Sequence, residues 1–137
     1  MTGYDPHQHA EELGLEVRYY PLKTCVGLYR ADENAILIRP GLRAAVERSV
    51  LAHEIAHHLL GHSTPRVGAW ARKQEIAADR MAAQALINPR ELRDIARTTP
   101  DRGRWAVELG VSGDLLTAFL DTHSWRIRAK GERAWDY

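Results

Sequence analysis

The stretch LRAAVERSVLAHEIAHHLL, residues 42–60, decides how this chain folds. Positions three or four residues apart share one face of an α-helix, and apolar residues and histidines recur at that spacing here. The shared face carries Leu42, Val46, Val50, His53, His57 and Leu60. Gly61 follows directly, and glycine commonly ends a helix. The stretch therefore predicts one long helix with an apolar side that also bears histidines.

Within that helix, residues 53–57 read His-Glu-Ile-Ala-His, the pattern H-E-x-x-H. His53 and His57 lie about one turn apart, so both imidazoles project to the same side and can bind one metal ion. Glu54 lies about 100° round the helix from His53, where its carboxylate can act on a water molecule without being a ligand. The pattern predicts a metal centre of the metalloprotease type, with His53 and His57 as ligands and Glu54 as the catalytic residue.

A catalytic zinc site of this kind needs a third protein ligand and an open fourth position. Glu75 lies in the next predicted helix, and Asp79 lies one turn further along the same face. We expect Glu75 to bind the metal and Asp79 to accept a hydrogen bond from the far ring nitrogen of His53. The alternative for this acidic pair is a solvated helix face beside Arg72 and Arg80. Imidazole ligands suit zinc, so we expect one Zn²⁺ per chain.

The residues before the long helix predict a short helix and three strands. Asp5 followed by Pro6 is typical of a helix start, and Gly14 is a suitable end. Runs rich in β-forming residues follow at 15–22, 26–30 and 35–39. The last two runs are separated by the four residues 31–34, which is typical of a β-hairpin. We expect a small antiparallel sheet, and an edge of this hairpin that pairs with an extended peptide substrate.

The residues after the long helix predict only helices. Thr64-Pro65 is a possible start for a helix that ends near Asn88, and Asn88-Pro89 starts the next one. Two shorter helices follow, the first ending at Gly110 and the second running from Ser112 to about Asp121. Trp70 and Trp105 are expected to be core residues. Strands followed by helices favour an α+β fold: a small antiparallel sheet packed on a helical, zincin-like core.

Length and composition favour one ordinary globular domain. The chain has 137 residues, of which 45% are hydrophobic and 27% charged. We expect a single domain over residues 1–137, in which 1–41 form the N-terminal helix and hairpin region, 42–89 the metal-binding helices and 90–137 the C-terminal helices.

Nineteen basic residues against eighteen acidic ones leave no excess charge to attract nucleic acid. No apolar run is long enough to span a membrane, and the single cysteine, Cys25, fits a cytoplasmic protein.

Three segments resemble the ImmA/IrrE family of metallopeptidases: HEIAHHLLGH (53–62), EIAADRMAA (75–83) and LINP (86–89). The resemblance implies a zinc-dependent, gluzincin-like protease of a bacterial or phage-infected cytoplasm. It implies that the substrate is a regulatory protein, typically the helix-turn-helix repressor of a phage, mobile element or stress response. Carried over residue by residue, it implies metal ligands at His53, His57 and Glu75, a catalytic Glu54, and a supporting role for Asp79.

The sequence leaves some site residues open. The donor that stabilises negative charge on the substrate carbonyl could be Tyr19, Tyr20, Tyr29 or His123. His58 is either a surface residue or a residue that supports the metal ligands, and His62 follows the helix end, where a cation suits the helix dipole; contact with the metal is the alternative for both.

A second class of function is also open. The segment from Trp105 to Leu120 has the rhythm of a helix-turn-helix, which would suit a DNA-binding protein with a structural zinc. Its second helix contains no Arg or Lys before Arg126, whereas a recognition helix presents cationic or amide groups to DNA. A degenerate metalloprotease that acts only as a sensor is the remaining alternative. We expect a protein substrate, no direct contact with nucleic acid and no association with membranes.

Overall fold

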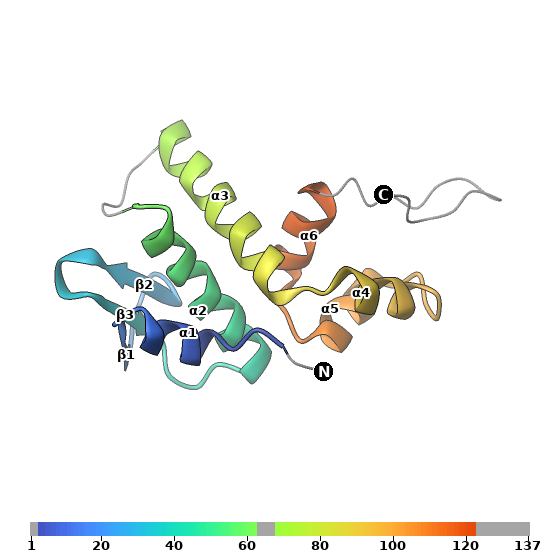
Figure 1. The fold of residues 1–137 in the computed structure, drawn as a ribbon, viewed down its shortest axis with the longest axis horizontal. Helices are drawn as coiled ribbons and strands as arrows, with labels where there is room; N and C mark the ends of the chain where they lie inside the picture. The colour runs from blue at the N-terminus through green and yellow to red at the C-terminus, as the bar shows by residue number, and fades with distance from the viewer. Residues whose placement is uncertain (1–2, 63–67, 123–137) are drawn as a thin grey trace.

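The computed structural model describes residues 3–62 and 68–122, and it consists of six α-helices and a small sheet within those ranges (Figure 1). In chain order the elements are α1 (Pro6–Glu12), β1 (Glu16–Tyr19), β2 (Gly27–Arg30), a 3₁₀ turn (Ala31–Glu33), β3 (Ala35–Ile38), α2 (Ala44–Leu59), α3 (Gly68–Leu86), α4 (Pro89–Ala96), α5 (Arg102–Leu109) and α6 (Gly113–Thr122). This confirms the α+β class. Among the described helices, none combines the length and apolar character needed to cross a membrane.

The three strands form a mixed sheet, so the predicted antiparallel sheet is wrong for one of its pairs. The strand order is β1-β3-β2. β2 pairs antiparallel with β3, as the hairpin pattern predicts, but β1 pairs parallel with β3. β3 is the strand with the most buried side chains, among them Ala35, Ile36 and Ile38. Burial therefore favours β3 in the centre, with one neighbour on each side, and leaves β2 as an edge strand.

Local sequence signals set the ends of several elements where they were predicted. The side chain of Asp5 accepts hydrogen bonds from the first turn of α1, and that of Asn88 does the same for α4. Asn34 adopts the left-handed conformation, with φ of 50°, and closes the four-residue connection between β2 and β3. Gly110 ends α5 in the same left-handed region, with φ of 71°. Thr64 and Pro65, the predicted start of α3, lie outside the described residues.

Helix α2 lies between two apolar clusters and contributes to both. One side of α2 packs with α1 and the sheet, through Leu51 and Ile55. Another side packs with the C-terminal helices, through Ala52. We name the larger of these the C-terminal cluster; it comprises Ala52, Ala82, Ala83, Leu86, Ile87, Leu92, Trp105, Ala106, Leu109, Val111, Leu115, Leu116, Phe119 and Leu120. Helix α3 runs beside α2 and also packs on α6 (Figure 1).

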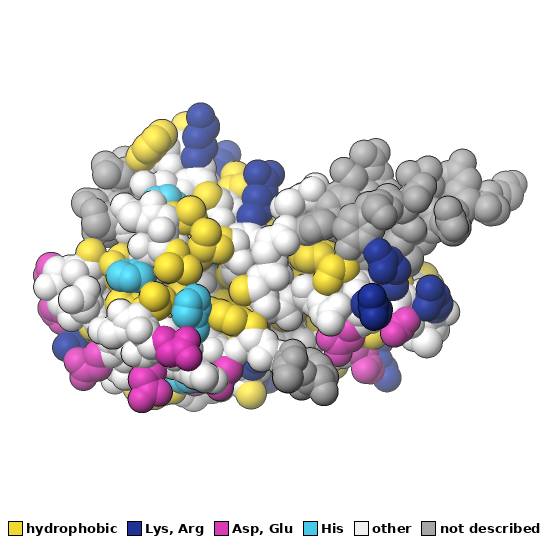
Figure 2. Space-filling view, viewed as in Figure 1, with side chains coloured by type: hydrophobic (Ala, Val, Ile, Leu, Met, Phe, Trp, Pro, Cys, Tyr) yellow, Lys and Arg dark blue, Asp and Glu magenta, His cyan; other side chains and the backbone are white. Residues whose placement is uncertain are grey.

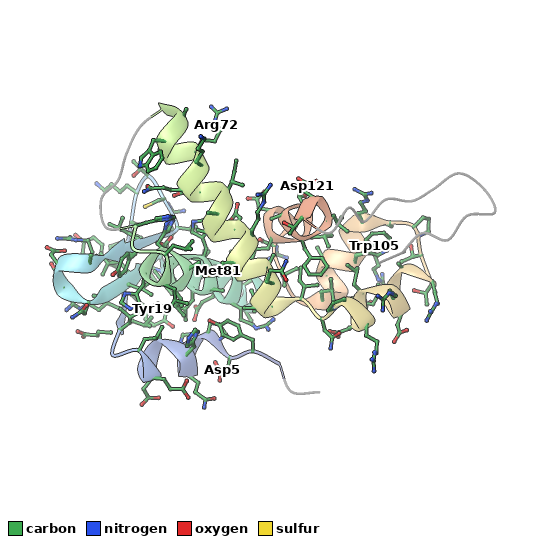
Figure 3. All side chains as sticks on the ribbon, turned by 45° about the horizontal axis from the view of Figure 1, so that its top comes forward. Asp5, Tyr19, Arg72, Met81, Trp105 and Asp121 are labelled. Atoms are coloured by element: carbon green, nitrogen blue, oxygen red, sulfur yellow. The ribbon has the colours of Figure 1, made fainter. Side chains whose placement is uncertain are left out.

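The two tryptophans predicted to be core residues differ in the structure. Trp105 is fully buried among the C-terminal helices (Figure 3), and its indole N–H donates to the backbone carbonyl of Thr99 at 2.8 Å. Trp70, in the first turn of α3, is 58% exposed, so the prediction for it is wrong. Helical spacing places a residue on a face, but it does not show whether another element covers that face.

Candidate metal centre

Helices α2 and α3 bring the three predicted metal ligands together. The Nε2 atoms of His53 and His57 lie 3.1 Å apart. Glu75 points both carboxylate oxygens at them: Oε1 lies 2.9 Å from Nε2 of His53, and Oε2 lies 3.0 Å from Nε2 of His57. One ligand atom from each residue lies within 4.8 Å of the others. Within the described residues, this is the group of side chains that could hold a metal ion.

The spacing and chemistry of these donors fit a small divalent cation. Metal–ligand bonds of about 2.0–2.1 Å in a tetrahedral site place neighbouring donor atoms about 3.3 Å apart. The two Nε2 atoms lie 3.1 Å apart, and each lies 2.9–3.0 Å from a different oxygen of Glu75, so a modest movement of the side chains would accommodate such an ion. Two imidazoles and one carboxylate are also the ligand set of catalytic zinc sites that retain an open position. The residues present therefore fit a metal ion of this type.

Asp79 takes the supporting position that the sequence predicts. The Nδ1–H of His53 donates to Oδ1 of Asp79 at 2.8 Å, and this leaves Nε2 of His53 directed at Glu75. Burial lowers the pKa of His53, but the hydrogen bonds with Asp79 and Glu75 outweigh burial and raise it to about 10. The hydrogen bonds with His53 and His57 lower the pKa of Glu75. The two carboxylates thus favour positive charge at the point where the three donors meet.

Glu54 lies beside this group, on the side facing the sheet. It is only 8% exposed, and its carboxylate accepts a hydrogen bond from the backbone N–H of Tyr29 in β2. Burial raises the pKa of the Glu54 carboxyl, and the nearby histidines and the Tyr29 N–H only partly oppose this. Strand and helix approach closely at Gly27, where an added Cβ would lie 3.3 Å from Oε2 of Glu54 and would overlap Cγ1 of Val50. Glycine at position 27 therefore permits the contact that holds Glu54.

A cavity of about 360 Å³ opens at the candidate site. It is lined by the segment that leads into β2, by α2 and α3, and by the residues at the start of α6. The lining residues are Cys25, Val26, Gly27, Val46, Ser49, Val50, His53, Glu54, Glu75, Asp79, Ser112, Asp114 and Leu115. On the face drawn in Figure 2, the visible histidine side chains lie on the half of the molecule that holds α2 and the sheet, away from α4 and α5.

The tyrosines considered as carbonyl-stabilising donors do not line this cavity. The hydroxyl of Tyr19 donates to Glu47 at 2.8 Å, and the hydroxyl of Tyr29 lies 2.8 Å from Nδ1 of His58. Tyr20 is 56% exposed. His123 lies outside the described residues. The structure therefore singles out none of the three tyrosines for the role that the sequence left open.

Two residues near the site were not assigned a role from the sequence. Gly27 matters because it lets β2 approach Glu54 and Val50 on α2 closely. Only the packing of β2 on α2 reveals this role. The Nδ1 atom of His62 lies 3.0 Å from Nδ1 of His57, so His62 contacts a candidate metal ligand on the side away from Glu75 and His53. A separation of five residues is not a same-face spacing in a helix, so periodicity gave no signal for this pair.

A helix bearing H-E-x-x-H, joined by a glutamate from the following helix, defines the zincin type of metallopeptidase core. Comparison with known families agrees: residues 10–120 match the IrrE N-terminal-like domain of peptidase family M78. The chain belongs to this family, the ImmA/IrrE metallopeptidases, as its motifs predicted. No curated protein matches the chain significantly.

Proposed function

We propose that this protein is a zinc-dependent endopeptidase that cleaves a regulatory protein. The observation that carries the proposal is the meeting of His53, His57 and Glu75 at one point, with the buried Glu54 carboxylate beside them. Membership of a metallopeptidase family supports the reaction class. Zinc is preferred because two imidazoles and a carboxylate are typical ligands of a catalytic zinc.

Each side chain has a separate task in this proposal. His53, His57 and Glu75 hold the metal, which when bound supplies a Lewis acid that polarises the scissile carbonyl and activates water. Asp79 keeps the His53 ring oriented, with Nε2 toward the metal. Glu54 accepts the proton of the attacking water and donates it to the departing amine. Burial, which raises the pKa of Glu54, suits a group that must both accept and donate a proton.

The edge of β2 is the proposed binding surface for the substrate backbone. Val26 accepts a hydrogen bond from the N–H of Arg39, so its backbone carbonyl faces the hairpin partner. Along an edge strand, the residues whose backbone N–H and C=O groups point to the neighbouring strand alternate with residues whose groups point away from it. The backbone N–H and C=O of Gly27, the residue after Val26, therefore point away from β3, at the cavity. An extended peptide added at this edge would lie beside His53 and Glu54.

A helix-turn-helix repressor is the proposed substrate, and the bacterial or phage-infected cytoplasm the proposed location. Both rest on the resemblance to ImmA/IrrE proteins. The DNA-binding alternative is not supported by the position of α6, whose apolar side is buried in the C-terminal cluster. Its charged residues, Asp114 and Asp121, are acidic and would repel phosphate.

The test is to incubate the purified protein with the repressor encoded beside its gene, with and without a zinc chelator. We expect cleavage at one site, loss of cleavage after metal removal and recovery on adding Zn²⁺. Glu54→Gln is expected to lower the cleavage rate by about 10²–10⁴-fold, because the amide cannot transfer the proton. The same variant should retain one zinc per chain, since Glu54 is not a ligand.

Three results would contradict the proposal. Cleavage that persists after complete metal removal excludes a metal-dependent hydrolase. Full cleavage by Glu54→Gln excludes Glu54 as the proton-transfer group. Stoichiometric zinc without cleavage of the neighbouring repressor would instead favour the sensor alternative, in which the centre is kept but hydrolysis is lost.

A further inference from the structure

The two histidines of the centre are supported by different kinds of group. Nδ1 of His53 is bonded to a carboxylate, that of Asp79, at 2.8 Å. Nδ1 of His57 lies 3.0 Å from the Nδ1 of another imidazole, that of His62. The His57 and His62 ring centroids lie 5.2 Å apart with the planes tilted by 56°. The rings therefore meet at their nitrogen edges and are not stacked.

The turn that ends α2 places His62 over His57. The N–H of Gly61 donates to the carbonyl of His58 at 3.2 Å, and the N–H of His62 donates to the carbonyl of His57 at 2.9 Å. With Gly61 at φ of +76°, these bonds form a Schellman motif, which folds the chain back over the last helical turn. Both the backbone and the ring of His62 are thus bonded to His57, and this contact is built into the helix end.

Tautomers determine what the ring contact does. Nε2 of His57 faces Nε2 of His53 and a Glu75 oxygen, so it is the atom that would bind a metal and must then be unprotonated. A neutral imidazole in that state carries its proton on Nδ1. The Nδ1–H then has Nδ1 of His62 as an acceptor at hydrogen-bonding distance. Without an acceptor there, the buried His57 could rotate or take the other tautomer.

We propose that His62 is a positioning residue of the metal centre, whose Nδ1 accepts the hydrogen bond that orients His57 for metal binding. His62 does for His57 what Asp79 does for His53, but with a neutral acceptor. In this arrangement the proton of His62 is on its own Nε2, which leaves Nδ1 unprotonated to accept. This inference rests on the proposed function only in that the centre binds a metal ion.

Two substitutions separate hydrogen bonding from packing. In His62→Asn, the amide oxygen stands where Nδ1 of the histidine stood and can accept the hydrogen bond. In His62→Phe, a ring of similar size remains but accepts nothing. We expect His62→Phe to weaken Zn²⁺ affinity by about 10–100-fold, measured by competition with a chromophoric chelator, and His62→Asn to recover most of the loss. His7→Ala, which removes an exposed histidine on α1, is the control and should bind Zn²⁺ like the wild type.

Further measurements distinguish the possible failures. Nitrogen NMR of the zinc-loaded wild type should show a protonated Nδ1 on His57, and the metal-free variants should melt close to the metal-free wild type. If His62→Phe binds Zn²⁺ as tightly as the wild type, or if His62→Asn binds more weakly than His62→Phe, the positioning role is wrong. If Co²⁺ spectra show that His62→Asn loses a metal ligand, His62 is a ligand and the inference is also wrong. Failure of the wild type itself to bind Zn²⁺ would instead overturn the proposed function.

Discussion

The C-terminal cluster and the face of α2 that points to the candidate metal centre differ in what they bury. The C-terminal cluster is apolar, with Trp105 fully buried and Phe119 1% exposed. The buried polar residues of the described chain, Ser49, Glu54 and His57, all lie on α2. Helix α2 therefore belongs both to the apolar region that stabilises the fold and to a region whose buried polar groups reduce the stability of the fold.

The cost of the polar region is clearest at Glu54. An ionised carboxylate loses hydration when it is buried, and its raised pKa reflects this. A single backbone N–H and two nearby histidines offset only part of the loss. Burial of apolar side chains in the C-terminal cluster supplies free energy without such a penalty. The comparison indicates that substitutions in the cluster should unfold the protein, whereas substitutions at the centre should mainly change metal binding and catalysis.

The largest effect on stability is expected from Trp105→Ala. Removing a fully buried indole leaves a large cavity and costs about 3–5 kcal/mol, a sizeable part of the total stability of a small domain. Urea unfolding of the metal-free protein measures this. Val107→Ala is the matched control on the same helix, because Val107 is 72% exposed and should change stability by less than about 0.5 kcal/mol. Equal effects of the two substitutions would show that α5 does not pack as described.

Loss of Glu75 is expected to remove the stabilisation that the metal provides. A ligand present at about 100 times its dissociation constant stabilises the folded state by about 2.7 kcal/mol. Wild-type protein should gain this much at such a Zn²⁺ concentration, and Glu75→Ala should gain little at the same concentration. Differential scanning calorimetry with and without Zn²⁺ measures the gain. Glu108→Ala, a glutamate paired with Arg104 on α5, should keep the full gain. An undiminished gain in Glu75→Ala would exclude Glu75 as a ligand.

Gly27→Ala tests whether the close contact of β2 with α2 matters. The new methyl group would overlap Cγ1 of Val50 and press on Glu54, at a cost of about 1–3 kcal/mol. Because Glu54 would be displaced, the cleavage rate should fall more than stability alone explains. Gly113→Ala is the control, since an added Cβ there meets no atom within 4 Å. Unchanged activity in Gly27→Ala would show that Glu54 does not depend on this contact.

Asn88→Ala is expected to have the smallest effect of this series. The Asn88 side chain accepts from the backbone N–H of Arg90 at 2.8 Å and of Glu91 at 3.4 Å, and loss of such a cap costs about 1 kcal/mol. Since α4 belongs to the stabilising region, thermal unfolding should shift while Zn²⁺ affinity stays unchanged. Arg90→Ala, in the same turn, should shift unfolding less. A change in Zn²⁺ affinity on loss of the cap would contradict the separation of the two regions.

The features that the sequence predicted correctly are mostly local. His53 and His57 share a face because helix geometry places residues four apart on one side. The caps at Asp5 and Asn88 depend on hydrogen bonds within one turn. The approach of Glu75 and Asp79 to His53 was predicted from their own helical spacing and from the resemblance to a family, and their roles at a metal ion stay predictions. In each case the information lies within one helix or in a motif already known.

Only the tertiary structure decided how separate elements approach one another. The parallel pairing of β1 with β3, the exposure of Trp70 and the contact of Glu54 with β2 depend on which faces of distant segments are buried together. The hydrogen bond between His57 and His62 is near in sequence, but it exists because the chain reverses at the end of α2. Sequence periodicity shows on which face of a helix or strand a side chain lies. It does not show which other element packs on that face, because that depends on how the whole chain buries its apolar surface.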